Sequence, residues 1–238
     1  YPDRDYYVSM LAYGNWRPAP VKAIPEENVL IVNVANFFWG VNAAGKGDSA
    51  RTPAEAYADW GKLTGKQIWR PNTGDPAGWQ KGLPDVPFGR RIEAFRYAAD
   101  HHAIGIYVDL VWNHWATQGP IYYLMAQLAW NPRADGRAIL DDYYGRAFGP
   151  ASGELKAYWT LMEEARNRKC DDYPGESNGY AEVYNAAFFD RAYGLLDQAA
   201  KQAASAPERY SQRIGFVRVG LDYTKRIAEL RELMKQWR

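Results

Sequence analysis

The sequence predicts an α/β protein: the C-terminal half of a (β/α)8 TIM-type barrel followed by an α-helical C-terminal domain. Three observations lead to this prediction. Four short β-prone runs alternate with helical segments in the first half of the chain, an order that favours a parallel sheet. Three of these runs are almost continuously apolar, as strands buried on both faces are. After Asn113 the pattern becomes helical and stays helical to the end.

The predicted strands cover residues 6–13, 28–34, 66–69 and 103–111. The first helix between them begins at Thr52, with Pro53 at its first position and Glu55 placed to complete a capping box. Gly65 is expected to end this helix. A second helix is expected over residues 88–102. Its inner side would carry Ile92, Phe95, Tyr97, Ala98 and Ala99, and its outer side Arg90, Arg91, Glu93 and Arg96.

The second half is expected to form five helices, over residues 119–129, 134–148, 151–169, 179–204 and 207–237. We place the domain boundary so that residues 1–117 form the barrel portion and residues 118–238 form the helical domain. Four strand units do not close a barrel, which needs about eight. No phosphate-binding glycine loop follows the first strand. The chain is therefore expected to begin in the middle of a barrel.

Charge and composition exclude several classes of function. The 29 Lys and Arg residues nearly balance the 28 Asp and Glu residues, which leaves no electrostatic footprint for nucleic acid or an anionic membrane. No apolar stretch approaches the roughly 20 residues of a spanning helix, so we expect no membrane insertion. The single cysteine, Cys170, excludes an internal disulfide, and three histidines do not build an ordinary zinc site. We expect no metal and no cofactor.

Aromatic residues make up 15% of the chain, with 10 Trp, 18 Tyr and 8 Phe. An aromatic and polar cluster follows each predicted strand, at the end where a (β/α) barrel builds its active site. Flat apolar walls with hydrogen-bonding edges suit a pyranose ring. The substrate-binding candidates are Tyr13, Asn15, Trp16, Asn36, Trp39, Trp69, Arg70, Trp112, Asn113 and Trp115.

Several of these residues have a structural alternative. Packing under the turn at Pro18 explains Tyr13 and Trp16 equally well. One of Trp112 and Trp115, which are three residues apart, is expected to face the helical domain.

The candidate catalytic residues are Asp75 and Asp109, because glycoside hydrolysis usually takes two carboxyl groups. Asp109 lies within an apolar run, where burial or pairing perturbs a carboxyl pKa. A buried structural role is at least as well supported for Asp109, and an ordinary turn role for Asp75. At least one catalytic carboxylate is therefore expected in the upstream half of the barrel.

Several segments together resemble a known family. They are residues 1–3 (YPD), 11–13 (LAY), 115–132, 142–149 (DYYGRAFG) and 218–223 (RVGLDY). They are similar to bacterial proteins that carry domain of unknown function 4838. The resemblance implies a glycoside-hydrolase-like barrel, often behind a domain similar to the N-terminal domain of α-glucuronidases, in secreted or periplasmic proteins that handle polysaccharides. The family leads us to expect an Asp-Tyr end at the third strand, where Trp69-Arg70-Pro71-Asn72 stands instead.

The leading hypothesis is a glycoside hydrolase whose partner is an oligo- or polysaccharide. Arg70 would be consistent with an acidic sugar, although arginine is as often a salt-bridge partner. One alternative is a non-catalytic glycan-binding protein on a degenerate barrel, which uses the same aromatic residues without an acid pair. Another is a polysaccharide lyase, which needs a basic side chain and neutralisation of a uronate. Sugar identity, linkage, stereochemistry and oligomeric state do not follow from the sequence.

Overall fold

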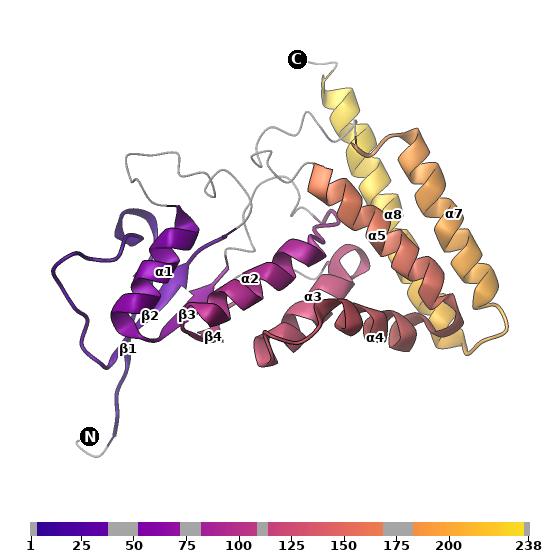
Figure 1. The fold of residues 1–238 in the computed structure, drawn as a ribbon. Helices are drawn as coiled ribbons and strands as arrows, with labels where there is room; N and C mark the ends of the chain where they lie inside the picture. Colours follow the sequence, from indigo (N-terminus) through magenta and orange to yellow (C-terminus); the bar gives the residue numbers. More distant parts are fainter. Residues whose placement is uncertain (1–3, 38–51, 72–81, 109–113, 169–182, 236–238) are drawn as a thin grey trace. The chain divides into compact units, whose positions relative to one another are not determined.

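A computed structural model describes residues 4–37, 52–71, 82–108, 114–168 and 183–235. Two compact units form along the chain. The first comprises Tyr1–Asp75, Arg90–Val111 and Ala129–Arg133, and the second comprises Pro76–Gly89, Trp112–Leu128 and Ala134–Arg238. The first unit contains the sheet with its two helices, and the second is helical (Figure 1). The domain boundary at residue 117 stays a prediction.

The sheet of the first unit has four parallel strands in sequence order. These are β1 (Val8–Ala12), β2 (Val29–Val34), β3 (Gln67–Arg70) and β4 (Ala103–Ile106). Each strand pairs in parallel with the next, so the prediction of an α/β fold with a parallel sheet is confirmed. The strands are shorter than predicted at several ends, and the register between β3 and β4 shifts at Gln67 and Ile68.

Helix α1 (Pro53–Thr64) connects β2 to β3, and its end signals act as predicted. The Thr52 hydroxyl accepts a hydrogen bond from the Glu55 backbone N–H at 3.2 Å, while the Glu55 carboxylate accepts one from the Thr52 N–H at 2.7 Å. This capping box satisfies two backbone donors that the first turn leaves without partners. Gly65 ends the helix with a φ of 65°, a left-handed conformation that favours glycine.

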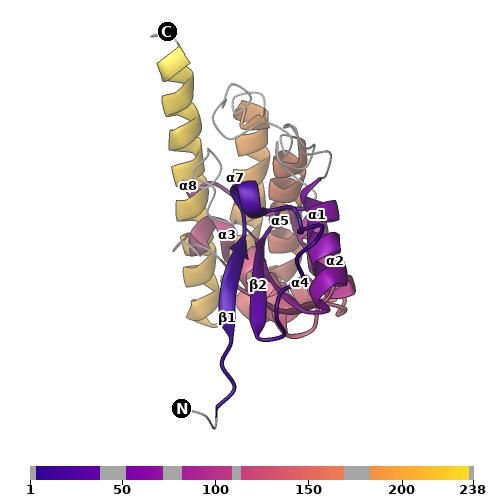
Figure 2. The same ribbon diagram turned by 90° about the vertical axis from the view of Figure 1, so that its left-hand side faces the viewer.

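Helices α1 and α2 (Phe88–Asp100) both pack on one face of the sheet (Figure 2). Gln67 of β3 links them, because its side-chain amide donates to the carbonyl oxygen of Tyr57 at 2.9 Å and to that of His101 at 2.8 Å. Its oxygen in turn accepts from the Asn33 amide of β2 at 3.1 Å. These hydrogen bonds lie in the core of the unit, where Ile31, Asn33 and Gln67 are fully buried.

The inner side of α2 is largely as predicted, with Ile92, Phe95 and Ala98 buried. The prediction that Arg91 faces water is wrong, since this side chain is only 4% exposed. Arg90 and Arg91 are adjacent, so they project about 100° apart around the helix. The charged residues that the sequence predicts on the outer side of α2 therefore do not all face solvent.

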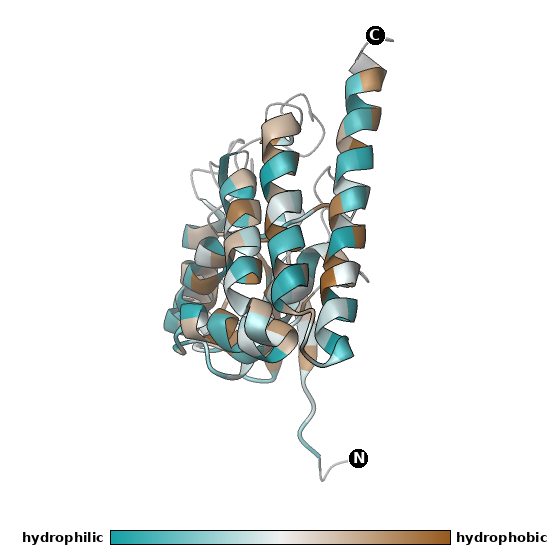
Figure 3. Cartoon of the chain, turned by 90° about the vertical axis from the view of Figure 1, so that its right-hand side faces the viewer, coloured by the Kyte–Doolittle hydropathy of each residue, from teal (hydrophilic) through white to brown (hydrophobic). Residues whose placement is uncertain are grey.

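The second unit contains α3 (Trp115–Trp130), α4 (Gly136–Phe148), the short η4 (Gly149–Ala151), α5 (Ser152–Arg168), α7 (Ala186–Gln202) and α8 (Glu208–Lys235). These elements confirm the predicted helical half within the described residues. Ile214, Val217 and Leu221, which recur at helical spacing on α8, are buried. Other apolar residues of α8 are exposed: Phe216, Val219, Leu230, Leu233 and Met234. Brown bands along the helix that ends near the C-terminus in Figure 3 mark its apolar residues.

Helix α3 begins at Trp115, four residues before its predicted start, and runs through Pro120. A proline inside a helix leaves the carbonyl four residues earlier without its usual donor. That carbonyl belongs to Ala116, and Gly220 of α8 approaches it so closely that a Cβ atom there would lie 2.6 Å from its oxygen. The absence of a side chain at Gly220 is what permits this approach.

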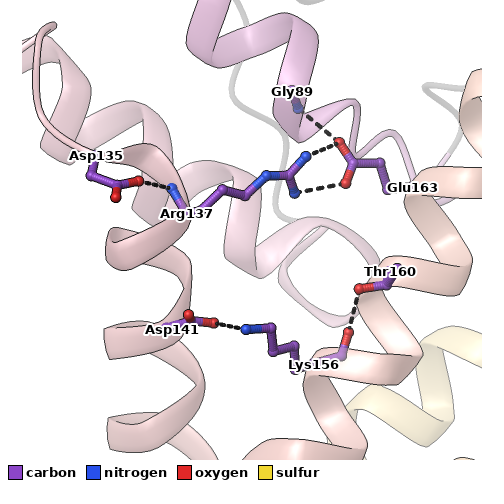
Figure 4. A network of polar contacts seen from close by, with 7 residues as sticks. All are labelled: Gly89, Asp135, Arg137, Asp141, Lys156, Thr160 and Glu163. Carbon is purple, nitrogen blue, oxygen red and sulfur yellow. Dashed lines mark hydrogen bonds and ion pairs between the residues drawn. The ribbon is translucent and has the colours of Figure 1, made fainter.

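Polar side chains connect α4, α5 and the first turn of α2 (Figure 4). Lys156 of α5 pairs with Asp141 of α4 at 2.7 Å. Deeper in the unit, the Glu163 carboxylate of α5 accepts hydrogen bonds from Arg137 of α4 and from the backbone N–H of Gly89. Asp142 pairs with Arg146 and accepts a hydrogen bond from Tyr123, so the acidic pair 141–142 is solvated and structural. Within the described residues, no helix combines the length and the apolar character needed to cross a bilayer.

Candidate functional site

The candidate site is the carboxyl edge of the sheet, which we define as the residues that end or directly follow its four strands. The carboxyl ends of parallel strands meet at one edge, and loops there commonly bind ligands in α/β proteins. The described residues of this edge are 13–17 after β1, 35–37 after β2, 70–71 at the end of β3, and 107–108 after β4. We describe the four ends in turn.

After β1 the chain forms a short 3-10 turn, η1 (Gly14–Trp16). Trp60 of α1 holds this turn, because its indole N–H donates to the carbonyl oxygen of Arg17 at 2.8 Å. Tyr13 and Trp16 are 49% and 75% exposed, and Asn15 is exposed as well. A Trp16 ring with three-quarters of its surface exposed is not packed beneath the Pro18 turn, so it presents an aromatic face to solvent.

After β2 the backbone is tied to β3. The Ala35 N–H donates to the carbonyl oxygen of Arg70 at 3.3 Å, and the Ala35 carbonyl accepts from the Trp69 indole N–H at 2.9 Å. Asn36 follows and is half-buried. These contacts set the position of the Asn36 backbone next to the end of β3.

The end of β3 places two predicted site residues on opposite faces. Successive side chains of a strand alternate, so Trp69 and Arg70 do not line the same surface. Trp69 is 1% exposed and stacks on Phe37 with ring centroids 5.1 Å apart. Its face is used in packing against Phe37, and it forms a T-shaped pair with Phe95 of α2. Trp69 therefore belongs to the core, whereas Arg70 is half-buried on the second face.

The second face of the sheet, opposite α1 and α2, contains a row of apolar side chains across β1, β2 and β3. Leu11 of β1 pairs in register with Val32 of β2, and Val32 pairs with Ile68 of β3. Leu11 is 48% exposed, and Val32 and Ile68 are half-buried. On the covered face, Ile31 and Gln67 have no exposed surface.

After β4 the structure adds a residue that the sequence analysis did not select. Tyr107 is 55% exposed, and the guanidinium carbon of Arg70 lies 5.1 Å from the centroid of its ring. The Tyr107 N–H donates to the Trp69 carbonyl oxygen at 2.9 Å. The predicted strand 103–111 placed Tyr107 in the interior of the strand, whereas β4 ends at Ile106 and Tyr107 directly follows it.

Five of the predicted site residues lie outside the described residues: Trp39, Asp75, Asp109, Trp112 and Asn113. Trp115 lies in the helical unit at the start of α3 and is 50% exposed. Its ring forms a T-shaped pair with that of Tyr122, with the ring centroids 5.0 Å apart. The described residues contain no group of three or more His, Cys, Asp or Glu side chains arranged to hold a metal ion.

The described carboxyl edge thus carries Tyr13, Asn15 and Trp16 after β1, Asn36 after β2, Arg70 at the end of β3 and Tyr107 after β4. Arg70 and Tyr107 are in contact. Aromatic rings, amides and a guanidinium can bind a polar ligand with flat apolar surfaces. Fold and site together define a parallel α/β protein with a polar and aromatic candidate binding edge. Residues 1–160 match the model of the family described as Domain of unknown function (DUF4838). The chain belongs to this family, as the sequence resemblance indicates. Neither the curated proteins nor the solved structures include a match to the chain.

Proposed function

We propose that this protein is a glycoside hydrolase that binds an oligo- or polysaccharide at the carboxyl edge of its sheet. The observation that carries the proposal is the set of exposed aromatic rings there, Tyr13, Trp16 and Tyr107, at 49%, 75% and 55% exposure. About half or more of the surface of each of these residues stays exposed, and the C–H face of a sugar packs well on exposed aromatic rings. Asn15 and Asn36 supply donors and acceptors for hydroxyl groups.

We further propose that the four strands are the second half of a (β/α)8 barrel. Three features support this arrangement. The strands are parallel and neighbour one another in sequence order, as barrel strands do. The helices α1 and α2 lie on one face of the sheet, and the opposite face is lined by Leu11, Val32 and Ile68. Strand β1 lies at the edge of the sheet, and Tyr7, Val8 and Leu11 are 63%, 59% and 48% exposed, an apolar edge that further strands would cover.

Amide hydrogen exchange tests the barrel proposal. The amides of Val8–Ala12 are compared between this chain alone and a longer protein that includes the preceding part of its reading frame. A preceding strand that pairs with β1 slows exchange of the amides that face it. Equal exchange rates in the two proteins would exclude a paired upstream strand.

A non-catalytic glycan-binding protein is the second candidate. This class is favoured because the described carboxyl edge contains no Asp or Glu, at residues 13–17, 35–37, 70–71 and 107–108. Both classes use the same aromatic surface, so binding and hydrolysis are measured separately. As for location, a protein that acts on polysaccharide is proposed to be secreted or periplasmic.

The test measures binding of an oligosaccharide panel by the intact protein and the release of new reducing ends. Trp16→Ala is expected to weaken binding about tenfold or more, because a stacked ring contributes on the order of 1–2 kcal/mol. Trp130→Ala is the matched control, because Trp130 is 92% exposed and is not part of the carboxyl edge. It lies three residues before Arg133, which pairs with Asp100, a residue that precedes β4. Equal losses in both variants, or no binding of any oligosaccharide, would overturn the proposal. Binding without hydrolysis would select the glycan-binding protein.

A further inference from the structure

We propose that one side of α8 binds the α8 of a second copy of this chain, so that the two helices form an antiparallel pair. The proposal is independent of the proposed function, because α8 lies wholly within the helical unit. Six exposed residues form this side of the helix, which we call the outer stripe: Phe216, Val219, Tyr223, Arg226, Leu230 and Leu233. Five of them are apolar or aromatic, and each of these five is between 41% and 61% exposed.

The outer stripe follows a seven-residue repeat, which is the spacing of a coiled-coil seam. Its first, third and fifth members lie seven residues apart, and so do its second, fourth and sixth members. At about 100° per residue, the six side chains fall within one narrow arc of the helix. The buried residues Ile214, Val217 and Leu221 lie on the opposite side of α8. The helix therefore has two apolar sides, and only one of them is used in the core of the unit.

An antiparallel second copy matches the outer stripe along its whole length. Phe216 then lies opposite Leu233 of the second copy, and Val219 lies opposite its Leu230. The outer layers are wholly apolar, and each central layer combines Arg226 with Tyr223. In a parallel pair, by contrast, the two Arg226 side chains would share one layer, where like charges repel each other. A single polar position in such a seam commonly determines how the helices pair.

The charges beside the outer stripe favour the same arrangement. Asp222 and Glu229 flank it on one side, four residues before and three residues after Arg226. Across an antiparallel pair, each Arg226 can reach the carboxylates of the second copy, so two arginines meet four acids. Asp222 accepts a hydrogen bond from Tyr193 at 2.6 Å, and a carboxylate has further acceptor sites. Charges at the margin of a helix pair contribute more to its orientation than to its affinity.

The helix is already ordered before it pairs. Short isolated helix pairs are marginally stable, because the helices must form as well as associate. In this protein, packing of the buried side on the helical unit holds α8 in its helical conformation. The outer stripe spans about 26 Å, from residue 216 to residue 233 at about 1.5 Å per residue. An interface of this length is small, so we expect a Kd in the micromolar range.

Sedimentation equilibrium of the intact protein tests the association, over about 1–300 µM to bracket the expected Kd. Val219→Glu is expected to raise the Kd about 100-fold or more, because each dimer would bury the added charge twice. Val21→Glu is the matched control, since Val21 is a 97% exposed valine of the first unit, and it should leave the Kd unchanged. A monomer at every concentration would overturn the proposal. So would an unchanged Kd in Val219→Glu, or equal losses in the two variants.

Disulfide trapping tests the orientation without a disruptive substitution, in a Cys170→Ser background. The antiparallel pair places residue 219 of one copy opposite residue 230 of the other, but leaves the two residues 219 about 16 Å apart. That separation is too long for a disulfide. A mixture of the Val219→Cys and Leu230→Cys proteins should therefore form a linked dimer that contains one copy of each, identified by mass. Either variant alone should stay unlinked. A disulfide within each single variant would show parallel pairing, and no disulfide in the mixture would show no pairing; either result would overturn the proposal.

Discussion

The carboxylate of Glu163 accepts hydrogen bonds from both terminal nitrogens of Arg137, at 2.8 and 3.3 Å. The Glu163 side chain is 9% exposed and the Arg137 side chain 58% exposed. The same carboxylate also accepts from the Gly89 N–H at 2.7 Å, so it caps the start of α2, where a negative charge is favourable. The buried carboxylate of Glu163 on α5 thus contacts both α4 and the first turn of α2. The hydrogen bond to Glu163 raises the pKa of the Arg137 guanidinium above its ordinary value.

Glu163→Gln is expected to lower the free energy of unfolding by about 1–3 kcal/mol, because a neutral amide weakens or loses the three charge-assisted hydrogen bonds that the carboxylate accepts. Urea unfolding followed by circular dichroism measures the change. Glu164→Gln is the control, since Glu164 is adjacent and exposed, and it should shift the free energy by less than about 0.5 kcal/mol. Equal effects in the two variants would show that the Glu163 contacts contribute nothing beyond general surface charge.

The close approach of α3 and α8 gives a matched pair of glycine substitutions. A Cβ at Gly220 would meet the Ala116 carbonyl oxygen at 2.6 Å, whereas a Cβ at Gly215 on the same helix meets nothing within 4 Å. Gly220→Ala should therefore destabilise by about 1–3 kcal/mol. Gly215→Ala should stabilise by up to about 1 kcal/mol, because alanine has the higher helix propensity. Thermal unfolding of both variants measures the opposite signs, and a stabilised Gly220→Ala would contradict the packing of these helices.

Alkaline pH is expected to weaken the helical unit. Burial raises the pKa of Tyr143 to about 12, from an ordinary value of 10.0. A raised folded-state pKa means that the folded state keeps a proton that the unfolded state releases. The stability is therefore fully present below pH 10 and is lost as the pH rises toward 12, with a slope of up to about 1.4 kcal/mol per pH unit from this group.

Tyr143→Phe tests that assignment. The variant should show a shallower loss of stability between pH 10 and 11.5 than the unmodified protein, as measured by urea unfolding at each pH. Tyr210→Phe is the control on α8. An unchanged slope in Tyr143→Phe would mean that other groups cause the alkaline loss.

Local signals in the sequence predicted the fold elements well. Thr52, Glu55 and Gly65 mark the ends of α1, because capping depends on nearby backbone groups that a short segment contains. The four strands were found from apolar runs, and their parallel pairing from the alternation with helices. The start of α3 was predicted four residues too late. A proline usually occupies the first turn of a helix, whereas Pro120 lies inside α3.

The faces of short strands were harder to predict. β3 has four residues, and all of its neighbours are set by long-range pairing with β2 and β4. The sequence placed Trp69 and Arg70 on one binding surface, although adjacent strand residues point to opposite sides. Only the packing of Phe37 and Phe95 decides that Trp69 is the inward residue. Tyr107 was missed because the apolar run predicted a strand that continues to residue 111, whereas β4 ends at Ile106.

Asp109 provides the sharpest test of catalysis, because it follows β4 two residues after Tyr107. If its carboxyl group transfers a proton or attacks the sugar, Asp109→Asn lowers kcat by about 100-fold or more with a much smaller change in KM. Asp75→Asn is measured beside it as the other candidate. Asp100→Asn is the control, since Asp100 ends α2 and pairs with Arg133 at 2.6 Å, before β4 begins. Unchanged hydrolysis in both Asp109→Asn and Asp75→Asn would assign the chemistry to other carboxylates. A lowered melting temperature together with proportionate losses of binding and activity would identify Asp109 as a structural residue.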